Sequence, residues 1–114
     1  MKEMRLYIAT PVTARKESSL KERVLAARHR VDLVKDLLAD EPPFKDYEMF
    51  STFDLPHDPE DVSEARAMGD CITAVLNCDA ILLDHGWQTS KGCNLEYRAA
   101  KIYGKKIYEF DKLD

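Results

Sequence analysis

Glu96 lies on the side of an expected helix that should be buried. Within segment 86–106, the residues that share its face at helical spacing are Gly92, Leu95, Ala99, Ala100 and Tyr103. Burying an unpaired carboxylate costs several kcal/mol, so such a group is normally paired, protonated or catalytic. The small residues one turn away leave space around it. Glu96 is therefore a candidate catalytic residue, and a structural salt bridge to an arginine or lysine is the alternative.

Asp70 is a second carboxylate on an expected helix, in the apolar segment AMGDCITAV. A solvated position on the helix edge is the alternative. If Asp70 and Glu96 reach one cleft, one can attack a substrate while the other transfers a proton. Acid–base chemistry is therefore a hypothesis that neither residue establishes alone.

Ser90 and Gly92 stand at the expected start of the helix that carries Glu96. A hydroxyl, free backbone amides and the positive end of the helix dipole together favour an anion. Plain capping by Ser90 is the alternative. The segment SKG lacks the spacing of a P-loop, and no Gly-x-Gly-x-x-Gly follows the first expected strand, which argues against a dinucleotide site of the usual kind.

Polar and aromatic residues in the loops are further candidates for ligand contact. Tyr7 ends the first expected strand region, and Thr10, Thr13 and Arg15 follow in the next loop. Their hydroxyls and cation can contact sugar or phosphate, although an ordinary polar loop has the same composition. Trp87, in the loop HGWQTS, can stack on a base or can serve packing or an interface.

Alternating strands and helices must position these side chains. Apolar runs predict strands at residues 4–10, 47–52, 79–84 and 105–110, and helical spacing predicts helices over about 20–39, 58–77 and 90–104. Ser19 with Glu22 fits a capping box, and Asp58 with Pro59 fits the start of the second helix. The expected apolar stripe of that helix consists of Val62, Ala65, Gly69, Ile72 and Leu76.

The nearly continuous apolar strands indicate a sheet that is buried on both faces. We therefore expect an α/β fold: one domain over 1–114, a flavodoxin- or Rossmann-like three-layer sandwich with a mostly parallel sheet of four or five strands. Ligands bind beyond the C-terminal ends of the strands in such sheets. The loops that follow the first three strands should carry the site.

Composition narrows the classes of partner. The net charge of -4, with lysine and arginine spread along the chain, argues against a nucleic-acid polymer. No apolar run is long enough for a membrane span. The three cysteines form no CxxC pair, and the three histidines show no metal-ligand spacing. We expect free thiols, a cytoplasmic protein and no metal.

Two segments resemble motifs of the nucleoside 2-deoxyribosyltransferase superfamily, especially those of a branch of small bacterial and phage proteins. LYIATPVT is similar to the opening motif YIxGPxT. MGDCITAVLNCDAILLDHGWQTSKGCNLEYRAAKIYGKKI is similar to a longer signature, with a helical Asp, then CD before a strand, then GWxxSxGxxxE. The likeness covers the first strand and the second half of the chain, whereas residues 14–59 match only in layout.

The resemblance implies cleavage of the N-glycosidic bond of deoxynucleosides or their 5′-monophosphates. It assigns Glu96 as the nucleophile that attacks C1′, Asp70 as the residue that helps to protonate the leaving base, and Tyr7 to the sugar site. Transferases of the superfamily tend to have Asp six residues before the glutamate, whereas the deoxynucleoside 5′-monophosphate N-hydrolases have a Ser that contacts phosphate. This chain has Ser90.

Two positions depart from the pattern. Thr10 replaces the usual Gly of the opening motif, so the loop should approach a ligand differently. Thr13 stands where the hydrolases place an Arg that contacts phosphate, and Arg15 and Lys16 follow slightly later.

The leading hypothesis is an N-glycosidase for (deoxy)nucleoside 5′-monophosphates with a covalent glycosyl-glutamate intermediate. A deoxyribosyltransferase and a non-catalytic nucleotide-binding module are the alternatives. The reaction needs no metal or organic cofactor, the ligand is a small nucleoside or nucleotide, and the resemblance implies a homodimer or a higher homo-oligomer.

Overall fold

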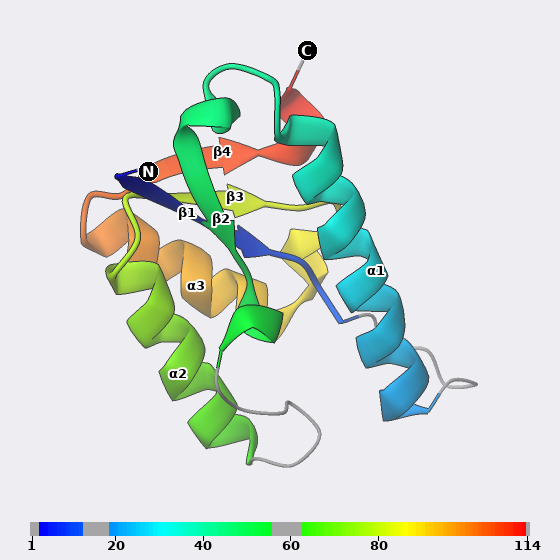
Figure 1. Cartoon of the computed structure of the whole chain (residues 1–114). Coiled ribbons are helices and arrows are strands. Elements are labelled where there is room, and N and C mark those ends of the chain that lie inside the picture. The colour runs from blue at the N-terminus through cyan, green and yellow to red at the C-terminus, as the bar shows by residue number, and fades with distance from the viewer. Residues whose placement is uncertain (1–2, 13–18, 56–62, 114) are drawn as a thin grey trace.

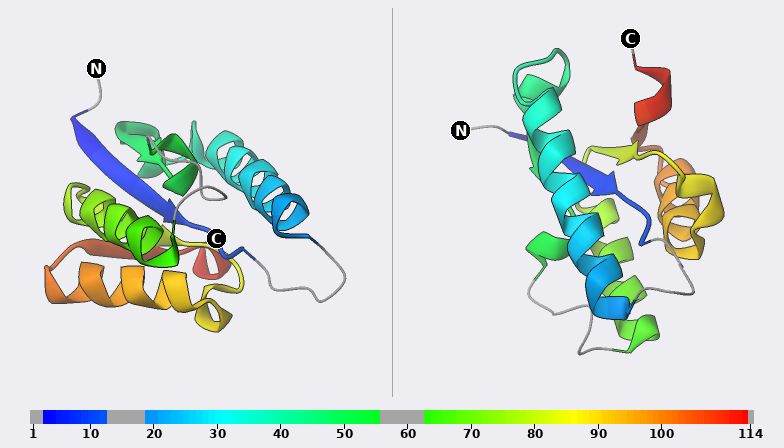
Figure 2. Two further views of the ribbon diagram at one scale, coloured as in Figure 1. Left: turned by 90° about the horizontal axis from the view of Figure 1, so that it is seen from below. Right: turned by 90° about the vertical axis from the view of Figure 1, so that its right-hand side faces the viewer.

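The computed structural model describes residues 3–12, 19–55 and 63–113. Its centre is a four-stranded parallel sheet in the order β2-β1-β3-β4. The strands are β1 (Met4–Ala9), β2 (Tyr47–Phe50), β3 (Ala80–Leu83) and β4 (Lys106–Glu109). The helix α1 (Leu20–Leu38) covers one face, while α2 (Glu64–Leu76) and α3 (Lys91–Ile102) cover the other (Figures 1 and 2). The expected three-layer α/β fold is confirmed, with a fully parallel sheet.

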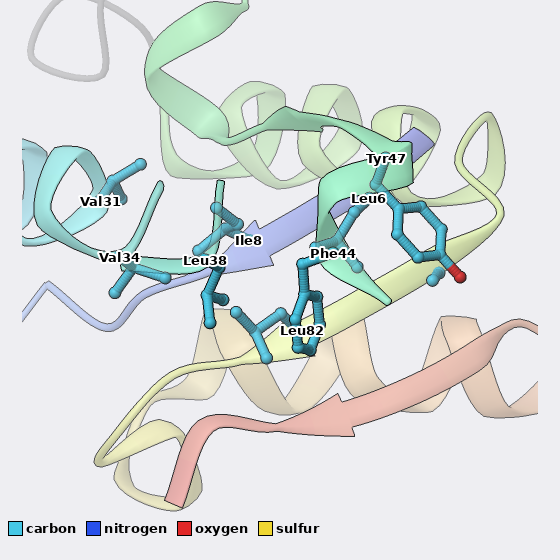
Figure 3. Close-up of a cluster of buried hydrophobic side chains, with 9 residues drawn as sticks. Leu6, Ile8, Val31, Val34, Leu38, Phe44, Tyr47 and Leu82 are labelled. Carbon is cyan, nitrogen blue, oxygen red and sulfur yellow. The ribbon is translucent and has the colours of Figure 1, made fainter. Parts of the chain in front are cut away.

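The two central strands supply core to both faces because successive side chains of a strand point in opposite directions. Leu6 and Ile8 of β1 pack with Leu82 of β3 against Val34 and its neighbours on α1 (Figure 3). The alternate residues of β1, including Tyr7, belong to the second cluster beneath α2 and α3. This alternation matters for function, because it directs Tyr7 toward the helix pair that carries Glu96.

The chain places β2 on one side of β1 and then crosses to place β3 on the other. The order of the strands therefore reverses at β1, and a crevice opens at such a point beyond the C-terminal ends of the strands. Ala9, the last residue of β1, is paired with Leu83, the last residue of β3, so the loops that follow them start side by side.

The ends of the helices agree with the sequence except at the start of α2. Ser19 caps α1 by accepting a hydrogen bond from the Glu22 amide at 3.1 Å. The helix α2 is capped by Ser63, which accepts from the Arg66 amide, so the predicted start at Asp58 was wrong. Asp58 itself lies outside the described residues. Serine is as good a cap as aspartate, so the sequence offered two equivalent starts.

The predicted buried faces of α2 and α3 were correct only in part: Glu96 and Ala100 are buried as expected, and Val62 lies outside the described residues. Ala65 and Gly69 are exposed, and Cys71 and Val75 form the buried line of α2. On α3, Leu95 is 50% and Tyr103 66% exposed, and the buried residues are Cys93, Glu96 and Ala100. Each helix carries apolar residues on two adjacent lines, so periodicity alone did not decide which line meets the sheet. None of the described helices is long and apolar enough to cross a bilayer.

Candidate active site

A cavity of about 480 Å³ lies at the C-terminal end of β1. It brings together five residues that the sequence singled out, namely Tyr7, Thr10, Ser90, Gly92 and Glu96. These residues come from β1, the loop after it, and the start of α3. The fold therefore assembles most of the expected site at the reversal of strand order.

Glu96 lies in the wall of this cavity and is 5% exposed. Its Oε2 atom is buried and has no hydrogen-bond partner among the described residues. Among the described residues no arginine or lysine forms an ion pair with it, so the alternative of a structural salt bridge finds no support. Burial raises the pKa of Glu96 to about 7, and a hydrogen bond from Tyr7 opposes the rise. The carboxyl group is thus poised to change protonation near neutral pH.

Tyr7 is the polar neighbour of Glu96 and is 1% exposed. Tyr7, Cys71 and Glu96 line the same cavity, and the latter two act on the pKa of Tyr7. Burial, followed by the charge of Glu96, raises the pKa of Tyr7 well above its usual value. Tyr7 therefore stays protonated and can donate to the carboxylate throughout the neutral range.

The N-terminus of α3 lies at the same cavity, which Ser90, Gly92 and Cys93 line. Ser90 Oγ accepts from the Cys93 amide at 3.2 Å, so Ser90 does cap the helix. A capping serine keeps its O–H available, and the first amides of a helix have no intrahelical acceptor. Gly92 allows close approach of α2, because a Cβ there would lie 3.3 Å from Met68 Sδ. Capping and anion binding are therefore compatible at this helix end.

Asp84 and Arg30 form a network that the sequence did not single out. Asp84 is 1% exposed, and Arg30 Nε and Nη2 donate to its two oxygens at 2.9 and 2.8 Å. Thr10 Oγ1 donates to Asp84 Oδ2 at 3.0 Å, an interaction that the glycine of the resembling motif cannot make. The network fixes the loop after β1 to the loop after β3. The sequence signal that could have indicated Asp84 is its position as a carboxylate directly after an apolar strand.

A second cavity, of about 550 Å³, lies beyond Thr10 on the α1 side. Its buried carboxylate, Asp84, is fully engaged by Arg30, Thr10 and a backbone amide. The smaller cavity, which holds the unpartnered Glu96 oxygen, is therefore the better candidate for chemistry.

Arg23, from the first turns of α1, lines both cavities and was also missed. The expected phosphate contacts Thr13, Arg15 and Lys16 follow the first strand and lie outside the described residues. Arg23 is separated from β1 by that loop, so its place beside the cavity depends on tertiary structure.

Asp70 and Trp87 are not among the described residues that line the Glu96 cavity. The Asp70 side chain is 40% exposed, with Oδ2 at 3.8 Å from Arg66 Nε, and its neighbour Cys71 faces the cavity. The Trp87 ring packs at 5.0 Å from Tyr97, and its Nε1 donates to a carboxylate of β4 at 3.3 Å. The Trp87 ring therefore makes packing contacts in this structure, and its part in ligand binding stays a prediction.

Within the described residues, no group of three or more His, Cys, Asp or Glu side chains is arranged to hold a metal ion. The polar groups that the described residues contribute to the cavity are two carboxyls, hydroxyls, thiols, amides and one guanidinium. Such groups suit a polar organic ligand with an anionic group.

Comparison with solved structures gives a likeness to the 2-deoxyribosyltransferase from Leishmania mexicana, with a TM-score of 0.63 and 19% sequence identity. The likeness covers 94% of this chain and 63% of that one, so the chain spans less than two thirds of the length of its structural neighbour. At this identity the likeness concerns the fold. No curated protein sequence matches the chain. A family model, the domain of unknown function DUF4406, matches residues 4–109. The chain therefore belongs to the DUF4406 family.

Proposed function

We propose that this protein is an N-glycosidase that cleaves the base–sugar bond of (deoxy)nucleoside 5′-monophosphates through a covalent glycosyl-Glu96 intermediate. The observation that carries the proposal is the buried Oε2 of Glu96, which has no partner among the described residues, in the wall of a cavity of about 480 Å³. A carboxylate with a free oxygen is the nucleophile that covalent glycosyl chemistry requires. The structural neighbour is named as an enzyme that transfers deoxyribose, which supports a related chemistry.

In the first step, a carboxylate oxygen of Glu96 forms a bond to C1′ as the N-glycosidic bond breaks. The bonding electrons leave with the base nitrogen, which takes a proton. In the second step, water attacks C1′ as the glycosyl ester breaks, which frees the carboxylate and a sugar phosphate, and the proton of the attacking water returns to the group that protonated the base. Tyr7, in the same cavity, can donate to the carboxylate and orient it, and burial keeps the carboxylate free of competing hydration.

The phosphate would bind at the start of α3. The Ser90 hydroxyl and the amides near Gly92 supply donors, and the half-buried Arg23 supplies a cation from the wall of the same cavity. Arg23 is thus proposed for the phosphate contact that the sequence analysis expected of Arg15. A phosphate held there would place the sugar between α3 and the end of β1.

The proton for the leaving base is assigned to Asp70, as the resemblance suggests. Asp70 lies on α2 beside Cys71, close to the cavity but outside its described lining. The assignment requires that Asp70 can reach the base. If it does, Asp70→Asn should slow release of a base that is a poor leaving group more than release of a good one.

The test is incubation with deoxynucleoside 5′-monophosphates and the free nucleosides, with liberated base measured by chromatography. We expect release of base and sugar phosphate, faster from the monophosphates. Addition of a second free base distinguishes a transferase, which would form a new nucleoside. Saturable binding seen as a thermal shift, with no base released over a long incubation, would instead support the binding module.

A further inference from the structure

Two cavities meet at the C-terminal end of β1, and the Glu96 cavity is one of them. Thr10 and Arg23 are the two described residues that line both cavities. The boundary between the two spaces therefore includes these side chains. The neighbouring cavity, of about 550 Å³, has room for a further group of a ligand. The boundary thus limits how far a ligand can extend from the Glu96 site.

The Thr10 side chain is held in place by a buried carboxylate. Thr10 Oγ1 donates to Asp84 Oδ2 at 3.0 Å, and Asp84 is 1% exposed. Arg30 donates to the two Asp84 oxygens at 2.9 and 2.8 Å, and the His85 amide donates at 2.7 Å. These bonds fill the roughly four acceptor positions of a carboxylate. Asp84 is therefore fixed from several sides, and it fixes the position of the Thr10 side chain.

Arg23 is the more mobile part of this boundary. Its Nε donates to the Ser19 carbonyl at 3.4 Å, which is a long bond in an exposed place. A guanidinium on a long side chain can therefore move toward a bound anion. The Thr10 hydroxyl already donates its proton to Asp84, so it has none left for a phosphate. Thr10 thus contributes bulk to the boundary, whereas Arg23 contributes charge.

We propose that Thr10 is a specificity-determining residue, whose anchored side chain closes the Glu96 cavity behind the phosphate and restricts the ligand to a nucleoside 5′-monophosphate. This inference rests on the proposed function, in which Arg23 binds the phosphate in that cavity. A second phosphate would have to pass Thr10 to enter the neighbouring cavity. Specificity then comes from a clash with the longer ligand.

The neighbouring cavity gives a second phosphate little attraction of its own. Its Arg30 guanidinium is already bound to both oxygens of Asp84, and Glu22 and Asp111 add carboxylates to the lining. Loss of the Thr10 side chain should therefore relieve the clash without making the diphosphate bind better than the monophosphate.

The experiment compares the dissociation constants of a deoxynucleoside 5′-monophosphate and of the 5′-diphosphate of the same nucleoside by isothermal titration calorimetry. Every variant carries Glu96→Gln, so that no ligand is consumed. With Thr10 intact, the monophosphate should bind at least about tenfold more tightly. Thr10→Ala should bring the two constants to within roughly threefold of each other, through tighter binding of the diphosphate. Thr10→Val keeps the bulk and the stiff β-branched shape, so its ratio should stay near that of Thr10.

Thr52→Ala is the matched control. Thr52 lines the Glu96 cavity and is not among the described residues that line the neighbouring one, so its loss should leave the ratio unchanged. An unchanged ratio in Thr10→Ala, or an equal collapse in Thr10→Val or Thr52→Ala, would overturn the proposal. Equal binding of the two ligands with Thr10 intact, or binding of neither, would also overturn it.

Circular dichroism establishes that each variant is folded. If Thr10→Ala does not fold, Thr10→Ser replaces it, because serine keeps the donor to Asp84 and loses only the methyl group. The ratio should then fall by a smaller factor, and a ratio equal to that of Thr10 would be the contradicting result.

Binding does not require turnover, so the two proposals can fail separately. The expected change of the ratio, with no base released by the protein that retains Glu96, would leave the role of Thr10 in place and remove the N-glycosidase. Base release by that protein, with a ratio that Thr10→Ala does not change, would do the reverse.

Discussion

Glu96 should make the folded protein less stable as the pH rises, and replacement by glutamine should remove that effect. The pKa of Glu96 is raised from 4.5 to about 7 by burial, so the folded state holds this proton more tightly than the unfolded chain does. The stabilising contribution of the bound proton is complete below the unfolded pKa and is lost as the pH rises through about 7. At 1.36 kcal/mol per unit, the shift corresponds to about 3 kcal/mol between the two limits.

Urea unfolding of wild type and Glu96→Gln at several pH values measures this effect. The two proteins should differ little in unfolding free energy near pH 4, and the variant should be more stable by about 3 kcal/mol above pH 8. Other groups titrate in both proteins and cancel in the difference. Glu64→Gln, which removes an exposed carboxylate from the same cavity, is the control. A gap between wild type and Glu96→Gln that does not widen with pH would refute the reasoning.

The same titration should govern activity. Because the nucleophile must be ionised, kcat/KM for base release should rise with pH and level off above about pH 7 in the free enzyme. A rate that falls as the pH rises through this range would require Glu96 to act as an acid.

Two further substitutions test the elements that hold the site. Arg30→Met leaves the buried Asp84 without its bidentate partner and should destabilise the fold by about 2 kcal/mol in thermal or urea unfolding. Lys35→Met breaks an ion pair at 2.9 Å with a more exposed partner and should cost less than about 1 kcal/mol, and equal losses would contradict the special role of Asp84. Ser90→Ala should lose about 1 kcal/mol of capping energy and should raise KM for monophosphates more than for nucleosides. Ser63→Ala removes the cap of α2 and should cost similar stability with KM unchanged, and the same KM change in both variants would argue against a phosphate site at Ser90.

The sequence predicted the fold well because the strands are marked by apolar runs and the helices by repeats and caps. It predicted the location of Glu96 correctly, since a carboxylate between glycine and alanine residues conflicts with ordinary helix packing. It failed on which apolar line of each helix meets the sheet, because Leu95 and Tyr103 are as apolar as the residues that are buried. That choice depends on how two helices share one face of the sheet.

The supporting residues of the site were harder to predict. Arg30, Asp84 and Arg23 are separated in sequence and meet only through the packing of α1 on the sheet. Cys71 looked like a small core residue, and its place beside Tyr7 follows from the packing of α2. Local sequence patterns predict the helices, the strands and the unusual position of Glu96. The neighbours of Glu96 in the cavity are determined by tertiary structure.

The central claim is that Glu96 attacks the sugar, and intact-mass and peptide analysis of a rapidly quenched reaction tests it most directly. Wild type turning over a deoxynucleoside 5′-monophosphate should carry one added sugar phosphate, on the peptide that contains Glu96. Folded Glu96→Gln should carry none and should release no base. Undiminished base release by Glu96→Gln, or an adduct on any other residue, would contradict the account.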